Sequence, residues 1–550
     1  MPKSTNVLTP VLLAILLTVI ASTVALMAKS TAAGYLSNLN LEHPELAKHA
    51  PILGFAPQRT SRRVILIIVD GLRLQDSFGR PTMGRLRRAG IDTTAQSHYP
   101  TISRPNHTAL VTGVPPLASG VRNNTYRSPV LIDSIMDRLQ AEGREATFIA
   151  DVSPSLAYLF SDDFAAMYYG NWTGAVAKST QLALARGQSD LLVIIPGAVD
   201  TAGHDHGGDS LQYRNAVTEV DRILAQSLVN VDLSLDTIII TADHGHTDDG
   251  GHGGEEESVM RVPLILAGAG IVPDALLGKV DLIDVAPTIA ALLGIPAPGH
   301  ALGRSLSEVL TISAADKEQL RRSDRLRIER NTKIYKESLA QARTHSQSTK
   351  RNRFFLLSGL FAVAILLLWG ARKVGALVVD WRVLLIAVPA YPLCYYGLLD
   401  LLGQSLSFSA LQDQGSEMSN LMRFGLIATA VQVLAGWLVL QNRVVLRDRL
   451  AAANALVLFG LLVAWIPAAL LWALHGDAPH VEIPGSTVAL LIPANYIAVS
   501  TYAVGATLLL VLEIIVFFAR AVDPRVRIRR LERAALRERN RLLIEEKENE

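Results

Sequence analysis

Cysteine is almost absent from this chain. Of its 550 residues only one, Cys394, is a cysteine, and it lies inside an apolar stretch. A single thiol forms neither a disulfide framework within the chain nor a thiolate zinc site, because both need several cysteines. Cysteine usage therefore does not reveal whether the protein lies in an oxidising or a reducing compartment. Any metal site must be built from side chains other than cysteine.

A large excess of charge of either sign is also missing. The 52 Lys and Arg residues nearly balance the 50 Asp and Glu residues, so the formal net charge is +2. Proteins that bind nucleic acids usually carry a basic surplus that neutralises phosphate groups. The balanced composition gives no reason to expect a nucleic-acid partner.

Hydrophobic residues make up half of the chain, and they are concentrated in long runs. A membrane-spanning helix needs roughly 20 apolar residues. Six stretches meet this requirement, approximately 8–28, 354–371, 383–402, 424–440, 452–474 and 490–519. The sequence therefore predicts an integral membrane protein with about six spans, in contact with membrane lipid. The first run is longer than the usual signal-peptide core of about 7–15 residues, which favours an uncleaved anchor over a cleaved signal.

Charged residues alternate between the loops that separate the last five spans. Basic residues follow the second and fourth spans, acidic residues follow the third and fifth, and an arginine follows the sixth (Arg372, Lys373, Arg382; Arg443, Arg447, Arg449; Asp413, Glu417; Asp477, Glu482; Arg520). Loops rich in Lys and Arg generally remain in the cytoplasm. This pattern predicts that both termini are cytoplasmic and that residues 29–353 lie outside the cytoplasm.

Five regions are expected along the chain. Residues 62–310 alternate short apolar runs with helical patterns, which predicts an α/β domain with a mostly parallel sheet between helices. The other regions are an N-terminal transmembrane anchor at 1–30, a charged helical connector at 311–353, a membrane domain of about five spans at 354–519 and a charged cytosolic tail at 520–550.

Three apolar runs of the α/β region lead into aspartates and histidines. The runs are VILIIVDG, LLVIIPGAVDTAGHDHGG and TIIITADHGHTDDGGHGG, which supply Asp70, Asp200 with His204, and Asp243 with His244 and His252. Parallel strands buried on both faces read as continuous apolar runs, and ligands bind beyond their carboxyl ends. Three carboxylates and three imidazoles are enough for two catalytic metal sites with an open position. Zinc is the expected metal, and manganese is the alternative.

A candidate nucleophile lies between the first two of these runs. Ser103 precedes Pro105 and the helical pattern NHTALVTG, so its hydroxyl is expected near the N-terminus of a helix. Free amides and the helix dipole favour an anion there. A hydroxyl bound to a metal can attack phosphorus. The alternative is that Ser103 only caps the helix.

The strings VDG, PTISRPNH, VDTAGH, ADHGHTDDGGHGG and DVAPTIAALLGIPAPGHALGRSL resemble the alkaline phosphatase superfamily. Within it, they are most similar to the type I phosphodiesterase/nucleotide pyrophosphatase group and to the GPI-anchor ethanolamine-phosphate transferases. The resemblance covers roughly residues 62–306 and implies an alkaline-phosphatase-like core. The membrane half of the chain has no such match.

The resemblance implies a role for each motif residue. One metal is expected at Asp70, Asp243 and His244 with Ser103 as its fourth ligand, and the other at Asp200, His204 and His252. Asn124 is expected to hold a phosphoryl oxygen. The short spacing from DHG to HGG resembles the ethanolamine-phosphate transferases more than the nucleotide phosphodiesterases.

Some residues of these motifs remain open to other interpretations. The phosphodiesterases usually place threonine at the position of Ser103, and Thr101 is the alternative nucleophile. His246 is interpreted as a neighbour of the ligands or as an exposed side chain. His107 and His206 are interpreted as hydrogen-bonding neighbours, and Asp248 and Asp249 as part of a solvated turn.

Two other activities of the superfamily fit the sequence poorly. Type I sulfatases carry an arginine four residues after the nucleophile, where this chain has His107. Cofactor-independent mutases usually carry a large inserted domain between the nucleophile and the metal-binding strands. Here 97 residues separate Ser103 from Asp200, which leaves limited room.

The sequence thus predicts a membrane-tethered, outward-facing two-metal phosphodiesterase or phosphotransferase that acts through a covalent phosphoserine. Its expected substrate is a lipid-linked or nucleotide phosphodiester, and the membrane bundle favours the lipid-linked one. One alternative is an ethanolamine-phosphate-type transferase with a glycan acceptor. The alternative from another class is a non-enzymatic scaffold or transporter with a degenerate hydrolase domain.

Overall fold

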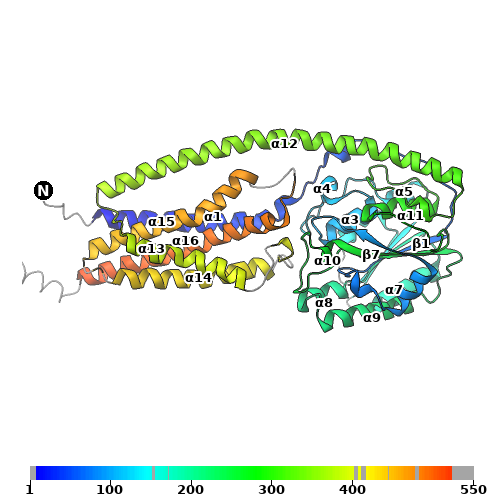
Figure 1. Cartoon of the computed structure of the whole chain (residues 1–550), viewed down its shortest axis with the longest axis horizontal. Helices are drawn as coiled ribbons and strands as arrows, with labels where there is room; N and C mark the ends of the chain where they lie inside the picture. The colour runs from blue at the N-terminus through cyan, green and yellow to red at the C-terminus, as the bar shows by residue number, and fades with distance from the viewer. Residues whose placement is uncertain are drawn as a thin grey trace, which may run out of the picture.

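The protein consists of a sheet domain and a long helical bundle that lie end to end (Figure 1). The computed structural model describes residues 8–522 except 152–154, 171–172, 402–406, 411–415, 442, 444 and 477–481. The charged tail expected at 520–550 lies almost entirely outside the described residues.

An eight-stranded sheet forms the centre of the first domain, with the strand order β4-β3-β5-β1-β6-β7-β2-β8. Its strands are β1 (Arg63–Ile68), β2 (Gly90–Gln96), β3 (Ala146–Ala150), β4 (Ala166–Tyr169), β5 (Leu191–Ile195), β6 (Asp236–Thr241), β7 (Arg261–Gly268) and β8 (Val280–Asp281). Only β7 runs antiparallel to its neighbours β6 and β2. The predicted mostly parallel α/β sheet is confirmed, and β2 is a strand that the apolar pattern did not reveal.

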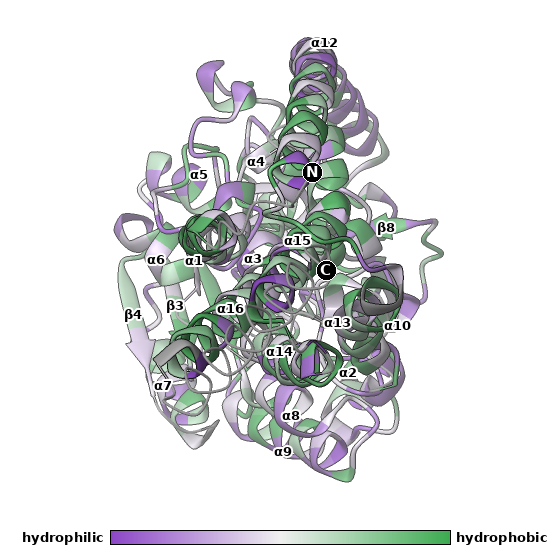
Figure 2. Ribbon diagram, turned by 90° about the vertical axis from the view of Figure 1, so that its left-hand side faces the viewer, coloured by the Kyte–Doolittle hydropathy of each residue, from purple (hydrophilic) through white to green (hydrophobic). Residues whose placement is uncertain are grey.

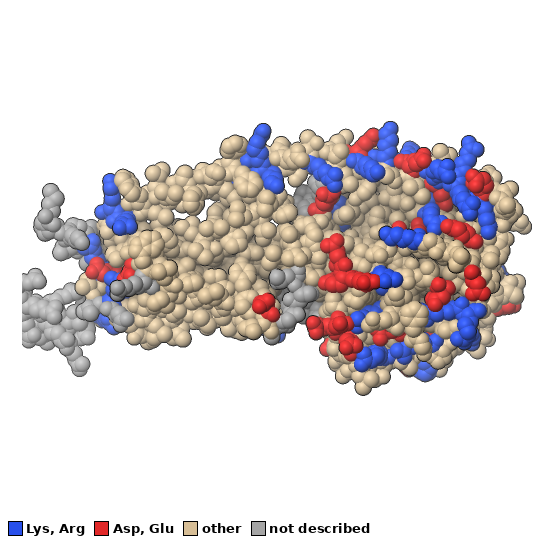
Figure 3. Space-filling model, viewed as in Figure 1, with Lys and Arg blue, Asp and Glu red and all other residues tan. Residues whose placement is uncertain are grey.

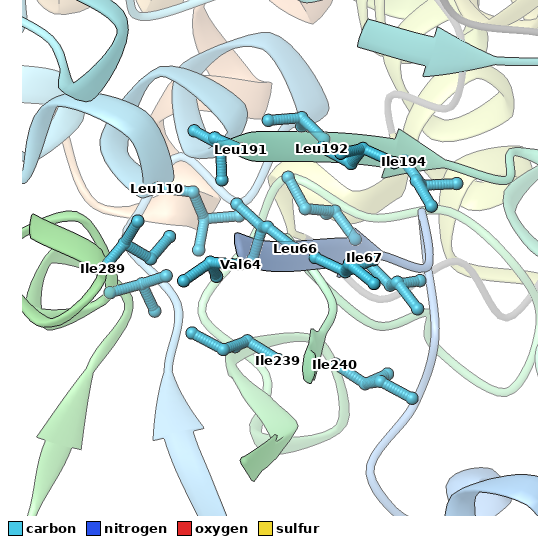
Figure 4. Packing of buried hydrophobic residues seen from close by; sticks show 14 of the residues in the cluster. Val64, Leu66, Ile67, Leu110, Leu191, Leu192, Ile194, Ile239, Ile240 and Ile289 are labelled. Atoms are coloured by element: carbon cyan, nitrogen blue, oxygen red, sulfur yellow. The ribbon is translucent and has the colours of Figure 1, made fainter. Parts of the chain in front are cut away.

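The central strands are buried on both faces because helices cover the two sides of the sheet. Every residue of β1, β5 and β6 is buried. Figure 4 shows Val64, Leu66 and Ile67 of β1 among side chains of β5 and β6, with Leu110 and Ile289 packed beside them. The helices of this domain are α2 (Pro81–Ala89), α3 (Ser103–Thr112), α4 (Pro116–Ser119), α5 (Ile135–Ala141), α6 (Ser155–Leu159), α7 (Thr173–Arg186), α8 (Ala198–His206), α9 (Leu211–Ser227), α10 (Glu257–Met260) and α11 (Val285–Leu293).

Six helices within the described ranges are long and apolar enough to cross a membrane. They are α1 (Leu8–Tyr35), α12 (Ala314–Lys373), α13 (Trp381–Leu401), α14 (Ser416–Gln441), α15 (Leu446–His475) and α16 (Ser486–Val522). The prediction of a membrane protein with about six spans is therefore supported. The connector and the second span form one continuous 60-residue helix, α12, which starts beside the sheet domain and runs along the bundle (Figure 1).

The bundle is mostly hydrophobic, as the view along its axis shows (Figure 2). Charged side chains gather over the sheet domain and again at the far end of the bundle, with few between them on the face in Figure 3. One ion pair is buried between α15 and α16, where Arg449 Nε donates to Glu513 Oε2 at 2.5 Å and Arg449 Nη2 donates to Oε1 at 2.6 Å. The two hydrogen bonds satisfy a charge pair that would otherwise be costly in an apolar environment.

Candidate metal centre and active site

Two of the predicted carboxylates lie side by side, just beyond the ends of neighbouring strands. Strands β1 and β6 are parallel and pair Ile68 with Thr241, so Asp70 and Asp243 both follow two residues beyond the sheet. The backbone N–H of Gly71 donates to Asp243 Oδ1 at 3.2 Å. The expected convergence of the strand ends thus brings these two acids together.

Asp200 reaches the same place from the other side of β1. It lies on α8, which follows β5, and β5 pairs with β1. One helical turn later, His204 places its Nε2 atom 3.4 Å from Asp200 Oδ2. Residues four apart on a helix share a face, which explains this contact. His246 Nε2 lies 2.9 Å from the other oxygen, Asp200 Oδ1.

His252 and His244 join the two groups of acids. Their rings stack with centroids 3.8 Å apart. His252 Nε2 lies 3.1 Å from His204 Nε2 and 3.7 Å from Asp200 Oδ1. His244 Nε2 lies 3.2 Å from Asp243 Oδ2. All six predicted metal ligands therefore belong to one continuous cluster.

Ser103 is the first residue of α3, and its hydroxyl faces this cluster. Ser103 Oγ donates to Asp70 Oδ1 at 3.3 Å and lies 3.1 Å from His244 Nε2. The preceding residue, Ile102, is the helix N-cap and makes no side-chain capping bond. Ser103 therefore does not serve as the N-cap. The N–H of Arg104 donates to Asn124 Oδ1 at 2.9 Å, which places the Asn124 amide beside the start of the same helix.

Close packing around Asp200 requires a glycine after Asp70. Gly71 has a φ of +73°, and a Cβ atom there would lie 2.9 Å from both the Asp200 Cα and the His246 Nε2. Any other residue would meet backbone and would also adopt a disfavoured left-handed conformation. The glycine of the VDG motif therefore permits β1 and α8 to approach each other.

Burial and neighbouring charges shift the pKa values of the cluster. Burial, together with the nearby carboxylates of Asp243 and Asp200, raises the pKa of Asp70 well above its ordinary value. Burial also opposes ionisation of Asp200, but hydrogen bonds from His204 and His246 outweigh it and hold the pKa of this carboxyl well below the ordinary value. Asp70 and Asp243 are buried and Asp200 is only partly exposed, and three neighbouring carboxylates of this kind repel one another unless a cation lies among them.

Three histidines of the cluster are held in the neutral form, which is the form that binds metals. Burial lowers the pKa of His107 and of His246, and it lowers the pKa of His252 to well below the ordinary value, so these rings stay neutral. His252 Nδ1 lies 2.9 Å from the carbonyl oxygen of Thr101, and His244 Nδ1 lies 3.0 Å from that of Gly245. A proton on each Nδ1 satisfies these carbonyls and leaves Nε2 free to act as a ligand.

These residues fit divalent metal ions. Asp243 Oδ2 is buried without a hydrogen-bond partner among the described residues, as is His107 Nε2, which lies 3.3 Å from it. A buried carboxylate oxygen that accepts no hydrogen bond is costly unless a cation coordinates it. The described residues contain three groups in which the possible ligand atoms all lie within 4.8 Å of one another, namely Asp200–His244–His252, Asp200–His204–His246 and Asp70–His107–Asp243.

Two of these ligand candidates, His107 and His246, are interpreted from the sequence as neighbours of the ligands rather than as ligands, with an exposed side chain as the alternative for His246. His246 is fully buried, and its contact with Asp200 suits a residue that orients this carboxylate. His107 lies four residues after Ser103 on α3, so helical spacing was the available signal for its position. His206 is exposed at the end of α8, and Asp248 and Asp249 are exposed in their turn.

The hydroxyl of Thr101 holds a loop of the site. Thr101 Oγ1 donates to the carbonyl oxygen of Gly254 at 2.8 Å and accepts from the N–H of Gly253 at 3.0 Å. Its carbonyl oxygen contacts His252, as described above. The side chain is fully buried, so both partners of the hydroxyl lie in the loop that carries His252. Ser103 rather than Thr101 presents its hydroxyl to the carboxylates.

A segment of the membrane region reaches the same loop. Ser409, between α13 and α14, accepts from the N–H of Gly254 at 2.9 Å and donates to Glu256 Oε2 at 2.7 Å. Beside it, the ring of Phe408 packs in one buried cluster with Ile102, which directly precedes the candidate nucleophile. The bundle is therefore in direct contact with the loop next to the metal centre.

Two family models match the sheet domain of the chain. The model for type I phosphodiesterase/nucleotide pyrophosphatase matches residues 64–153. The model for the metalloenzyme superfamily matches residues 172–297. The resemblance inferred from the motifs is confirmed. The two matches together contain all six predicted ligands as well as Ser103 and Asn124.

Curated relatives align with the same half of the chain. The catalytic subunit of GPI ethanolamine phosphate transferase 3 of Mus musculus is 26% identical over 294 residues, which cover 46% of this chain and 26% of the relative. GPI ethanolamine phosphate transferase 1 of Homo sapiens is 26% identical over 312 residues, which cover 46% and 34%. The chain thus spans about a third or less of the length of these relatives.

Solved structures align with less than half of the chain. Murine ectonucleotide pyrophosphatase/phosphodiesterase 5 is 16% identical, with a TM-score of 0.38, and the alignment covers 43% of this chain and 96% of that one. The alkaline phosphatase PafA is 12% identical, with a TM-score of 0.40 and coverage of 46% and 100%.

Proposed function

We propose that this protein is a membrane-bound, metal-dependent phosphotransferase that acts on a lipid-linked phosphodiester. The observation that carries the proposal is the position of the Ser103 hydroxyl at the start of α3, 3.3 Å from Asp70 and 3.1 Å from His244. A nucleophile at a helix N-terminus beside metal-binding side chains suits attack on a phosphoryl group.

Two metal ions are assigned to the cluster. Asp70, Asp243 and His244 would hold one, with Ser103 beside it, and a second set would hold the other (Asp200, His204 and His252). When bound, the metals supply positive charge that polarises the phosphoryl group and favours the ionised hydroxyl. His246 keeps the Asp200 carboxylate in place through its 2.9 Å hydrogen bond. Zinc is the proposed metal because imidazole and carboxylate ligands are mixed, and manganese is the alternative.

The reaction proceeds in two displacements at phosphorus. Ser103 Oγ attacks, a bond forms between this oxygen and phosphorus, and the bond from phosphorus to the first alcohol breaks. The hydroxyl proton passes to Asp70, to which the hydroxyl already donates, and the departing alcohol takes up this proton. In the second displacement the oxygen of an acceptor alcohol bonds to phosphorus and the bond from phosphorus to Ser103 Oγ breaks. The proton of the acceptor passes by way of Asp70 to Ser103 Oγ, which restores the free hydroxyl. The Asn124 amide beside the N-terminus of α3 is positioned to bind a phosphoryl oxygen.

The relatives favour a particular group for transfer. Those described above are named GPI ethanolamine phosphate transferases, which supports phosphoethanolamine as the transferred group and an alcohol rather than water as the acceptor. The contact of Ser409 with the loop of His252 supports a substrate that comes from the membrane, because the bundle adjoins the site.

The basic residues of the bundle support one orientation of the protein. Lys373 ends α12 and Arg447 lies at the start of α15, which is the end of the bundle away from the sheet domain (Figure 1). The positive-inside rule assigns this end to the cytoplasm and the sheet domain to the opposite side of the membrane.

Four substrates compared on the purified full-length protein test the proposal. They are phosphatidylethanolamine, bis-p-nitrophenyl phosphate, a nucleotide diester and p-nitrophenyl phosphate. We expect the lipid diester to turn over fastest and the monoester slowest, and we expect an added glycan to accept phosphoethanolamine. A monoester that is the best substrate by a wide margin would contradict a diester-acting site. Release to water alone would favour a phosphodiesterase over a transferase.

A further inference from the structure

A groove lies on the membrane bundle, between α12 and the helices α1, α15 and α16. It encloses about 300 Å³, at the lower end of the range of about 300–1,000 Å³ for ligand sites. The lining is almost entirely apolar and comprises Val24, Met27, Ala28, Thr31, Leu356, Leu357, Leu360, Trp465, Ala468, Ala469, Trp472, Tyr496 and Val499. Because it lies within spanning helices, only hydrocarbon is available to fill it in a bilayer.

Two cations stand at the end of the groove nearer the sheet domain. Lys350, Arg353, Leu357 and Leu360 are spaced three, four and three residues apart along α12, so they share one face of the helix. Leu357 and Leu360 line the groove, and the two cations occupy the preceding turns. This arrangement places positive charge where an apolar channel meets the more polar part of the membrane.

Arg353 is held in place but keeps part of its hydrogen-bonding capacity. Its guanidinium carbon lies 5.9 Å from the ring centroid of Trp472, a lining residue, and its Nε donates to the carbonyl oxygen of Ala473 at 3.3 Å. Its Nη2 is buried and has no hydrogen-bond partner among the described residues. Within the described ranges, no ion pair forms on Arg353 or Lys350, and no lining residue is acidic. A buried donor of this kind requires an acceptor.

We infer that this groove binds one anionic phospholipid. An acyl chain lies between α12 and the bundle, and the phosphate accepts hydrogen bonds from Arg353 and pairs with Lys350. An anionic headgroup suits two cations that no acidic lining residue offsets, whereas the amine of a zwitterionic headgroup would add repulsion. This site goes beyond the proposed function, since it requires neither the metals nor Ser103.

Tryptophan fluorescence can report the occupant, because Trp465 and Trp472 line the groove. Full-length protein in lipid nanodiscs is titrated with brominated phosphatidylglycerol, and in a matched series with brominated phosphatidylcholine at the same bromine content. We expect phosphatidylglycerol to quench more strongly at low mole fraction. This excess should disappear when Trp465 and Trp472 are both replaced by Phe, and it should persist in Ser103→Ala.

Charge variants then test the headgroup contact. The double variant Lys350→Gln/Arg353→Gln should weaken the preference for phosphatidylglycerol about 30-fold, which corresponds to about 1 kcal/mol for each cation. The matched control is Arg351→Gln, which removes an exposed charge from the same turn of α12. If Arg353→Gln proves unstable, Arg353→Lys is used in its place. This variant keeps the charge and should therefore retain most of the preference for phosphatidylglycerol. Equal quenching by the two lipids, or an equal loss in the control, would overturn the inference.

Discussion

The two hydroxyl groups of the PTISRPNH segment are expected to have separable roles, and replacing each one in turn tests this. In the structure Ser103 faces Asp70 and His244, whereas Thr101 holds the loop of His252 through two buried hydrogen bonds. We expect Ser103→Ala to abolish turnover at every metal concentration, with its metals retained. Thr101→Val should instead weaken metal binding and leave turnover near normal once the metal is saturating.

The size of the Thr101→Val effect follows from the bonds it removes. Valine has nearly the same shape as threonine but neither donates to Gly254 nor accepts from Gly253. A buried hydrogen bond contributes about 1 kcal/mol, so two contribute about 2 kcal/mol. That energy corresponds to about a 30-fold lower affinity for the metal that His252 binds. Loss of a group that orients a ligand typically lowers metal affinity by about 10–100-fold, which agrees.

Activity measured against free zinc in chelator buffers separates the two outcomes. The Thr101→Val curve should shift to higher free metal with a similar plateau, whereas Ser103→Ala should give no plateau, with metal content checked by mass spectrometry. A Thr101→Val protein that stays inactive at saturating metal, together with an active Ser103→Ala protein, would show that Thr101 is the nucleophile. It would also mean that the register of the motif is shifted by two residues.

Four further outcomes are expected. Chelation should remove about two equivalents of metal and all activity, and active protein without metal would contradict the ligand assignment. His246→Ala should lower metal affinity about 10–100-fold through loss of its bond to Asp200, with partial recovery in His246→Gln, as metal titration would show. Ser409→Ala removes two hydrogen bonds between the membrane region and the loop of Gly254, and it should raise KM for a lipid diester more than for bis-p-nitrophenyl phosphate. Burial raises the pKa of Asp284 to about 6, above its unfolded value of about 3.9. The folded state therefore binds a proton at Asp284 more tightly than the unfolded state does. The stability that this proton contributes is lost as pH rises from about 4 through 6. The thermal midpoint should therefore fall more between pH 5 and pH 7.5 in the wild type than in Asp284→Asn.

The local pattern was sufficient to predict the main strands and most of the candidate site. β1, β5 and β6 are continuous apolar runs, and a strand buried on both faces of a parallel sheet has that composition. Because the carboxyl ends of parallel strands meet at one edge, the same pattern predicted that Asp70 and Asp243 lie together, and the pairing of Ile68 with Thr241 in the structure agrees. The spans could also be predicted from the sequence, because a bilayer imposes a minimum length on each apolar helix. The metal identity, the roles of the ligands and the orientation remain proposals.

Other features depend on contacts between residues far apart in the chain. β2, with the sequence GIDTTAQ, is mostly polar and pairs with β7, so it has neither a continuous apolar run nor an alternating pattern that would reveal a strand. His246 could be read as exposed because its neighbours in sequence include glycine and aspartate. It is buried because Gly203 of α8 and Gly71, which follows β1, lie close to its ring, with Tyr213 beside it.

Composition and spacing alone thus predict that this chain inserts into a membrane and that it carries acids and imidazoles at the ends of buried strands, because both are periodic or local properties. They do not predict that Thr101 supports a ligand loop, that Ser409 of the membrane region contacts that loop, or that Lys350 and Arg353 stand at the end of an apolar groove. Each of these is a contact between segments separated by tens to hundreds of residues. The Thr101 contact arises only when the sheet domain folds, and the other two arise only when the bundle packs against that domain or against α12, so no local pattern contains them.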